Sequence, residues 1–478
     1  MLFNSLDFAI FLPIVFALYW SVFRNRLKAQ NAYLVLVSYI FYGWWDWRFL
    51  SLIAFSSSVD FLVGIGLGRR EDRRSRNLLL LTSIVTNLGL LGFFKYFNFF
   101  ADSFANAFSL FGTKLDVARL SIVLPVGISF YTFQTLSYSI DVYRRKLEPT
   151  RDPVAFFAFV SFFPQLVAGP IERATNLLPQ FFQNREFDYS KAVDGLRQIL
   201  WGLFKKMVVA DNCATIVNAV YASPSEYSGS TLALATLFFA FQIYGDFSGY
   251  SDIAIGTARL FGFDLMRNFA FPYFSRDIAE FWRRWHISLS TWFRDYLYIP
   301  LGGSKAGTTY ALRNILIIFV VSGFWHGANW TFIVWGFLNA LYFLPLFLMS
   351  RNRENLDIAS VGRIVPGLPD VMKISVTFIL TCIAWVFFRS ASVSQAFGIL
   401  STVFSASIMQ IPQVYSLKTL SFISLMLVFE WLQRDRLHAL DLSNRNIPGW
   451  LRWGVYYFLI WLVLFFGGEQ KQFIYFQF

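Results

Sequence analysis

His326 is the most informative of the three histidines in this chain. It stands in Ser322-Gly-Phe-Trp-His-Gly-Ala-Asn-Trp330, between two apolar runs that are almost uncharged. An ionisable side chain at membrane depth costs free energy unless it faces protein or water, so such a residue marks a functional site. A neutral imidazole can take the proton of an attacking hydroxyl group and return it to a leaving group. We therefore predict that His326 is a general base. The alternative is a buried histidine bonded to a helix carbonyl group.

The neighbours of His326 are candidate lining residues of a substrate tunnel. Trp325 and Asn329 belong to the same short segment. Gly323 and Gly327 flank the histidine, and glycine lets a backbone leave the regular helix and lets a substrate approach closely. A metal site is not expected, because the three histidines are scattered and the two cysteines form no CxxC pair.

A second candidate, His286, lies in the charged and aromatic segment 261–301. Isoleucine, tryptophan, leucine and tyrosine recur there at positions 278, 282, 285, 289, 292 and 296, which predicts one helical face. Glu280 stands four residues before Arg284, the favourable order for an ion pair. The functional interpretation is that His286 takes part in the chemistry of the site. The alternative for His286 is a contact with lipid headgroups.

Asp246 and Asp252 are two carboxylates in the otherwise apolar sequence Tyr244-Gly-Asp-Phe-Ser-Gly-Tyr-Ser-Asp252. Residues six apart do not share a helical face, so a paired acid and base is not expected unless the helix breaks at Gly249. Two interpretations stay open. In one, the carboxylates fix a kinked helix by hydrogen bonding; in the other, they form a polar wall of a tunnel.

Composition identifies the elements that must position these residues. The chain has 478 residues, of which 56% are hydrophobic and 15% charged, whereas soluble domains contain about 25% charged residues. A membrane-spanning helix needs about 20 mostly apolar residues. Continuous apolar runs also exclude the alternating pattern of a barrel. These runs include 77–94, 118–140, 231–240, 374–388 and 455–466. The sequence predicts an all-α polytopic membrane protein with about ten to twelve transmembrane or re-entrant helices.

The net charge of +12 indicates orientation in a membrane and not binding to nucleic acid. Arginine and lysine cluster in loops near residues 24–28, 69–76, 144–146, 351–363 and 434–445. Such loops stay on the cytoplasmic side of the membrane. Segment 390–417 contains no charged residue and is therefore expected on the outer side.

The chain is expected to form one integral membrane domain over residues 1–478. Nothing in it resembles a linker, and no internal repeat is visible, which weakens a transporter interpretation. Segment 191–210 mixes basic and apolar positions at helical spacing, which indicates an amphipathic helix at the membrane surface whose second half dips deeper.

Two long motifs resemble the bacterial branch of the membrane-bound O-acyltransferase (MBOAT) family, and most closely its alginate O-acetyltransferases. One runs from Phe281-Trp-Arg-Arg-Trp-His-Ile-Ser-Leu-Ser to Tyr298, and the other is Phe324-Trp-His-Gly-Ala-Asn-Trp330. Further similar segments are 124–134, 163–170, 246–252 and 473–478. The resemblance covers essentially the whole chain.

The resemblance implies a helical bundle around a central tunnel, with His326 at the family's invariant histidine and His286 at its second signature histidine. It implies an enzyme of the bacterial inner membrane that takes acetyl from a cytoplasmic acyl thioester, acetyl-CoA, as a substrate with no bound cofactor. The acetyl group would pass to an exported polysaccharide such as alginate, through a periplasmic partner with a serine-hydrolase-like domain. Arg283 and Arg284 would then suit the donor phosphates.

Alternatives remain at this point. A transporter or flippase would use the histidines as gates without acyl chemistry, although no nucleotide site supports a primary pump. Within the family, D-alanyl transfer to teichoic acid and O-acetylation of peptidoglycan are both consistent with the motifs.

Overall fold

A computed structural model describes residues 1–109, 119–121, 123–167, 169–305, 307–442 and 447–474. These residues form helices and loops, and none of them lies in a β-strand. The last part of the C-terminal motif, residues 475–478, lies outside the described residues. Two compact units are present: unit 1 comprises 1–191 and 258–265, and unit 2 comprises 192–257 and 266–478.

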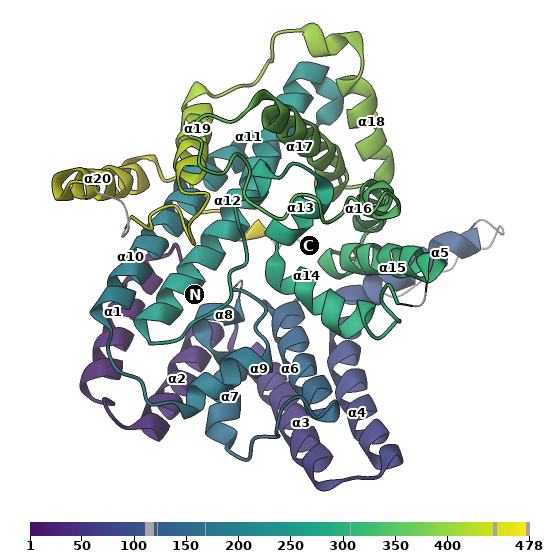
Figure 1. The fold of residues 1–478 in the computed structure, drawn as a ribbon. Coiled ribbons are helices and arrows are strands. Elements are labelled where there is room, and N and C mark those ends of the chain that lie inside the picture. The colour runs from purple at the N-terminus through teal and green to yellow at the C-terminus, as the bar shows by residue number, and fades with distance from the viewer. Residues whose placement is uncertain (110–118, 122, 168, 306, 443–446, 475–478) are drawn as a thin grey trace. The chain divides into compact units, whose positions relative to one another are not determined.

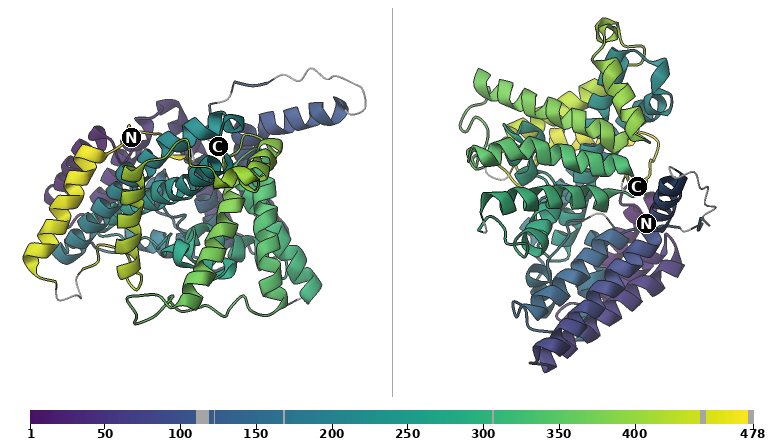
Figure 2. Two further views of the ribbon diagram at one scale, coloured as in Figure 1. Left: turned by 90° about the horizontal axis from the view of Figure 1, so that it is seen from above. Right: turned by 90° about the vertical axis from the view of Figure 1, so that its right-hand side faces the viewer.

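Unit 1 is a bundle of helices from the first 191 residues. Helix α6 packs between α3 and α4, and α7 packs on α2 (Figure 1). Most of the purple and blue helices of this unit lie alongside one another in the right-hand view of Figure 2. Its elements are α1 (Leu6–Ser21), α2 (Leu27–Gly43), η1 (Trp47–Phe49), α3 (Leu50–Arg69), α4 (Arg73–Leu91), η2 (Gly92–Tyr96), α5 (Phe97–Ser109), α6 (Ile128–Tyr143), α7 (Pro153–Ser161), α8 (Phe163–Leu166), α9 (Ala174–Leu177) and η3 (Leu178–Phe182).

A buried polar cluster joins three of these helices. The carboxylate of Asp60 in α3 accepts hydrogen bonds from Ser83 at 2.5 Å and Asn87 at 2.7 Å in α4, and from Ser139 at 2.6 Å in α6. Thr135 of α6 donates to the Asn87 side-chain oxygen at 3.0 Å. Buried polar groups need such partners, so the cluster fixes how α3, α4 and α6 pack.

Unit 2 carries both signature histidines. Its elements are α10 (Tyr189–Leu203), η4 (Phe204–Ala210), α11 (Asp211–Ala222), η5 (Pro224–Glu226), α12 (Gly229–Leu260), η6 (Pro272–Phe274), α13 (Ile278–Arg284), α14 (Ile287–Phe293), η7 (Arg294–Tyr298), α15 (Thr308–His326), α16 (Trp330–Leu348), α17 (Leu368–Arg389), α18 (Val393–Val403), η8 (Ala406–Met409), α19 (Leu417–Leu432) and α20 (Gly449–Phe466). The first residues of α10, up to residue 191, and the last residues of α12, from residue 258, belong to unit 1. Helix α16 packs against α15, α17 and α13.

Within the part of the chain that the structure describes, seven helical segments are long and apolar enough to cross a membrane. They are Trp47–Arg69, Arg73–Ser109, Gly229–Leu260, Thr308–His326, Trp330–Leu348, Leu368–Arg389 and Gly449–Phe466. Shorter apolar helices, Leu6–Ser21 and Val393–Val403, accompany them. The protein is thus an all-α, multi-pass membrane protein. The expected ten to twelve helices divide into these seven long ones and a group of shorter ones. Among the described residues of the apolar run 118–140, the helix begins at Ile128.

One local helix prediction for unit 2 needs correction. The face predicted over 278–296 is not one helix, because α13 ends at Arg284 and α14 begins at Ile287, with His286 at a left-handed φ of 43° between them. In segment 191–210, Lys205 and Lys206 are buried, which agrees with a second half that lies deeper than the first. Helix α12 runs unbroken through Gly249.

Candidate active site

His326 is the last residue of α15, and a close helix crossing holds it in place. A Cβ atom on Gly323 would lie 2.2 Å from the carbonyl oxygen of Phe332 in α16, and one on Gly336 would lie 2.2 Å from that of Phe319 in α15. The sequence suggested that Gly323 lets the backbone leave the regular helix. Instead, Gly323 lies within the helix and lets the backbones of α15 and α16 come into contact. The helix ends at His326 because the next residue, Gly327, is extended.

Aromatic rings surround the His326 imidazole. Trp325, Trp335 and Phe388 lie at ring-centre distances of 5.0, 5.1 and 5.5 Å, all edge to face. The side chains of Trp335 and Trp385 stack on each other at 5.7 Å. His326 itself is 2% exposed. The ring is thus enclosed by protein from α15, α16 and α17, as a functional group at membrane depth requires.

The fold brings His286 next to His326. Their ring centres are 6.4 Å apart, and Trp325 lies 6.1 Å from His286. One oxygen atom placed between rings at this separation can make hydrogen bonds of ordinary length to both. The structure thus brings the two predicted histidines together, and their roles stay predictions. A lipid-headgroup contact does not fit the His286 ring, which is fully buried.

Asn268 fixes the orientation and tautomer of His286. Its side-chain oxygen lies 3.1 Å from Nδ1 of His286 and also accepts hydrogen bonds from the backbone N–H and the hydroxyl of Ser288. A backbone N–H can only donate, so the amide atom facing His286 is the oxygen. Nδ1 must therefore carry the proton, and Nε2 carries the lone pair. Among the described residues, Nε2 has no hydrogen-bond partner.

His286 is held neutral by its surroundings. Phe247 meets the imidazole edge to face at 4.6 Å, and burial lowers the pKa of His286 to about 3. A charged ring has no compensating partner in such a site, so the neutral form persists. Near neutral pH, the free Nε2 lone pair is available as a hydrogen-bond acceptor.

An apolar cavity of about 270 Å³ opens one helical turn from each histidine. Ser290 follows His286 in α14 by four residues, Ser322 precedes His326 in α15 by four, and both line the cavity. Neither imidazole is among the described lining residues. The walls are largely aromatic and aliphatic, including Trp282, Phe293, Ile318, Phe319 and Phe347, while two exposed arginines, Arg294 and Arg353, also line it. An apolar interior with cationic groups suits a ligand that carries an anionic end.

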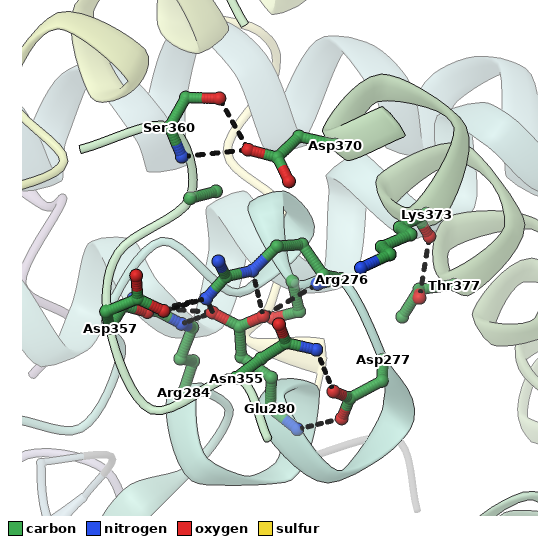
Figure 3. A network of polar contacts seen from close by, with 12 residues as sticks. Arg276, Asp277, Glu280, Arg284, Asn355, Asp357, Ser360, Asp370, Lys373 and Thr377 are labelled. Atoms are coloured by element: carbon green, nitrogen blue, oxygen red, sulfur yellow. Dashed lines mark hydrogen bonds and ion pairs between the residues drawn. The ribbon is translucent and has the colours of Figure 1, made fainter. Parts of the chain in front are cut away.

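Arg283 and Arg284 bind the loop that carries Arg353. Arg283 donates to the carbonyl oxygens of Asn352 and Asn355 at 2.7 and 2.6 Å. Arg284 pairs with Glu280 at 2.8 Å, as the sequence spacing predicted, and donates to the Asp357 carbonyl at 2.9 Å. Figure 3 shows Arg284, Glu280 and Asp357 converging. These contacts shape one wall of the cavity, and direct contact of Arg283 and Arg284 with a donor stays a prediction.

Asp246 and Asp252 pair with neighbouring lysines. Asp246 contacts Lys206 at 2.8 Å and accepts from the backbone N–H of Ile474 at 2.6 Å. Asp252 contacts Lys205 at 2.6 Å. The two carboxylates are therefore separate, as their spacing predicted. Each is occupied in a buried ion pair, which favours the structural interpretation over a tunnel wall.

The remaining candidates near His326 have distinct places. Trp325 lies beside both histidines and is 4% exposed. Asn329 is the N-cap of α16, accepts from the Thr331 N–H and donates to the Ala391 carbonyl. Sequence reasoning missed Asn268, Trp335 and Phe388. Asn268 gives no local signal, because it lies 18 residues from the histidine it orients.

The chain belongs to the MBOAT, membrane-bound O-acyltransferase family, whose sequence profile matches residues 144–388. This range contains both histidines and the helices around them. The protein is therefore an O-acyltransferase, and the transporter interpretation is set aside.

Three relatives are similar over 60–79% of their own length. The "Probable alginate O-acetylase AlgI" of Pseudomonas aeruginosa is 38% identical over 87% of this chain and 77% of its own. The "Peptidoglycan O-acetyltransferase" of Helicobacter pylori is 34% identical over 84% of this chain and 79% of its own. The "Teichoic acid D-alanyltransferase" of Streptococcus thermophilus is 28% identical over 50% of this chain and 60% of its own.

Proposed function

We propose that this acyltransferase moves acetyl from a cytoplasmic acyl thioester, acetyl-CoA, across the bacterial inner membrane for O-acetylation of an exported polysaccharide such as alginate. The observation that carries the proposal is the neutral His286 with its free Nε2 lone pair, 6.4 Å from His326 in one aromatic enclosure. The similarity to two O-acetylating relatives over more than four fifths of this chain supports acetyl as the group and a cell-envelope polymer as its destination.

The chemistry needs one base and one thioester. His326 takes the proton of the acceptor hydroxyl group while the hydroxyl oxygen attacks the thioester carbonyl carbon. The carbon–sulfur bond of the resulting tetrahedral adduct breaks, and the imidazolium returns the proton to the sulfur. An ester and a free thiol result, with no net change in protons. His286 accepts a hydrogen bond through Nε2 and orients the reacting group.

The apolar cavity is the proposed donor site. Its aromatic interior accommodates the thioester arm, and the exposed Arg294 and Arg353 meet the donor phosphates. Arg283 and Arg284 contribute by holding the loop 352–357 in place. A periplasmic partner with a serine-hydrolase-like domain completes delivery to the polymer; support for this step comes from the sequence resemblance.

The test uses the full chain in lipid nanodiscs with radiolabelled acetyl-CoA. His326→Ala is expected to abolish acetyl transfer while protein amount and thermal stability stay near those of the wild type. If this variant transfers acetyl at the wild-type rate, His326 is not the general base.

Donor binding is tested separately. Arg294→Ala combined with Arg353→Ala should raise KM for acetyl-CoA, because two cationic contacts with the phosphates are lost. The matched control is Arg351→Ala, since this exposed arginine pairs with Glu354 at 2.6 Å and does not line the cavity. An unchanged KM in the double variant would exclude this cavity as the donor site.

A further inference from the structure

A second, much smaller cavity lies behind Asn268, in unit 2. Its volume of about 10 Å³ is enough for one water molecule. The polar residues that line it come from separate segments: α10, α12, the loop before η6 and the segment after α19. They include Trp201, Ser251, Asp252, Arg267, Asn268 and His438.

Three of these residues carry a buried nitrogen that the described residues leave without a hydrogen-bond partner. The atoms are Nε1 of Trp201, Nη2 of Arg267 and Nδ1 of His438. A buried polar group that makes no hydrogen bond costs free energy of folding. Three such atoms around one small cavity therefore indicate a common ligand.

The chemistry of the lining identifies that ligand. Trp201 and Arg267 can only donate hydrogen bonds. His438 contacts Asp194 through Nε2 at 3.0 Å; a carboxylate accepts, so Nε2 carries the proton and Nδ1 is an acceptor. The Asp252 carboxylate is a second acceptor. A ligand with two lone pairs and two protons matches this set. The Asp252 carboxylate would repel an anion, and the Arg267 guanidinium group would repel a cation.

We propose that this cavity binds one structural water, and that the water positions His286 through Asn268. Arg267 directly precedes Asn268 in the chain, and the Asn268 amide also donates to the Ser251 hydroxyl at 3.1 Å. The backbone carbonyl of Asn268 accepts from the N–H of Ile287 at 2.9 Å. The water therefore joins α10, α12 and His438 to the residue that sets the tautomer of His286. Trp201, Arg267 and His438 are positioning residues.

Only the consequence for catalysis rests on the proposed function; the water and the tautomer do not. The chain contains three histidines, so labelling with ¹⁵N-histidine gives three imidazoles to resolve by solid-state NMR in a bilayer, with His286→Asn assigning one of them. In the wild type, His286 should be the Nδ1–H tautomer alone. Magnetisation should pass from water to Nδ1 of the buried His438.

The decisive variant is Trp201→Phe, which removes the indole N–H and keeps an aromatic ring. We expect a mixture of His286 tautomers. The kcat should fall on the order of tenfold because His286 is misplaced relative to His326. The KM for acetyl-CoA should stay unchanged because the donor cavity is intact. Trp450→Phe, at a tryptophan that is 76% exposed, is the matched control and should change neither.

Two results would overturn the proposal. One is a single, unaltered His286 tautomer in Trp201→Phe. The other, which applies even if that variant fails to fold, is the absence of magnetisation transfer from water to His438 in the wild type. Loss of acetyl transfer in every preparation, with the tautomer shift still seen, would count against the proposed function and leave the water site standing.

Discussion

Replacing Gly323 with alanine tests how the fold positions His326. The new Cβ atom would lie 2.2 Å from the Phe332 carbonyl oxygen, and ordinary van der Waals contact begins at 3.4 Å. The difference requires α15 and α16 to separate by about 1 Å. The obstructing atoms belong to the backbone, so no side chain can rotate away to relieve the clash. His326 lies three residues further along α15 and must move with it.

We expect Gly323→Ala to lower the free energy of unfolding by about 1–3 kcal/mol, the usual cost of overpacking. The kcat for acetyl transfer should fall on the order of a hundredfold, because a shift of about 1 Å in a reacting group has that effect. Thermal unfolding in detergent and initial rates in nanodiscs measure the two effects.

Two glycine variants calibrate this result. Gly336→Ala should resemble Gly323→Ala, since its Cβ would lie 2.2 Å from the Phe319 carbonyl oxygen. Gly398→Ala in α18 meets nothing within 4 Å and should stabilise its helix by up to about 1 kcal/mol. Wild-type stability and rate in Gly323→Ala would refute the idea that this crossing positions His326.

Two further predictions concern the charge state of His286 and the loop beside the cavity. The unfolded chain protonates this histidine near pH 6.5 and the folded protein only near pH 3, because burial lowers its pKa to about 3. The unfolded state then binds more protons between these values, so the free energy of unfolding should decrease as pH falls from about 6.5. His286→Asn should flatten the plot of Tm against pH in that window, and an unchanged slope would contradict the assignment. Glu280→Gln should lower the free energy of unfolding by about 3 kcal/mol, because Glu280 is 1% exposed and pairs with both Arg276 and Arg284. The control is Glu354→Gln, since Glu354 belongs to an exposed ion pair. Equal Tm values for the two variants would count against the network in Figure 3.

The Glu280–Arg284 ion pair and the all-helical membrane class are confirmed, whereas the role of His326 stays a prediction, and all three have a signal that is visible in the sequence. His326 is conspicuous because it interrupts an apolar stretch, and Glu280 and Arg284 are four residues apart on one helix. The membrane class follows from composition alone. Each of these inferences needs only residues that are close in sequence.

The parts that were missed depend on distant partners or on unusual backbone. Periodicity predicted one helix through residue 286, but His286 adopts a left-handed φ of 43°, which non-glycine residues rarely do. Asn268 can reach its ring only because of that break. Lys205 and Lys206 resemble surface lysines, yet they are buried against Asp252 and Asp246 of α12. The glycines near His326 suggested a helix break. The position of α16 shows instead that Gly323 allows two helices to pack closely.

The different settings of the two imidazoles indicate why the enzyme has a pair of them. A general base works best when its pKa is near the working pH, and burial lowers the pKa of His286 to about 3. His286 is therefore a poor proton acceptor in the resting enzyme, although its Nε2 lone pair can still accept a hydrogen bond from a hydroxyl group. That hydrogen bond would orient the acceptor oxygen toward the thioester without forming a second cation in the aromatic enclosure. In the proposed mechanism, proton transfer then falls to His326, where the positive charge would exist only while the tetrahedral adduct carries a compensating negative charge.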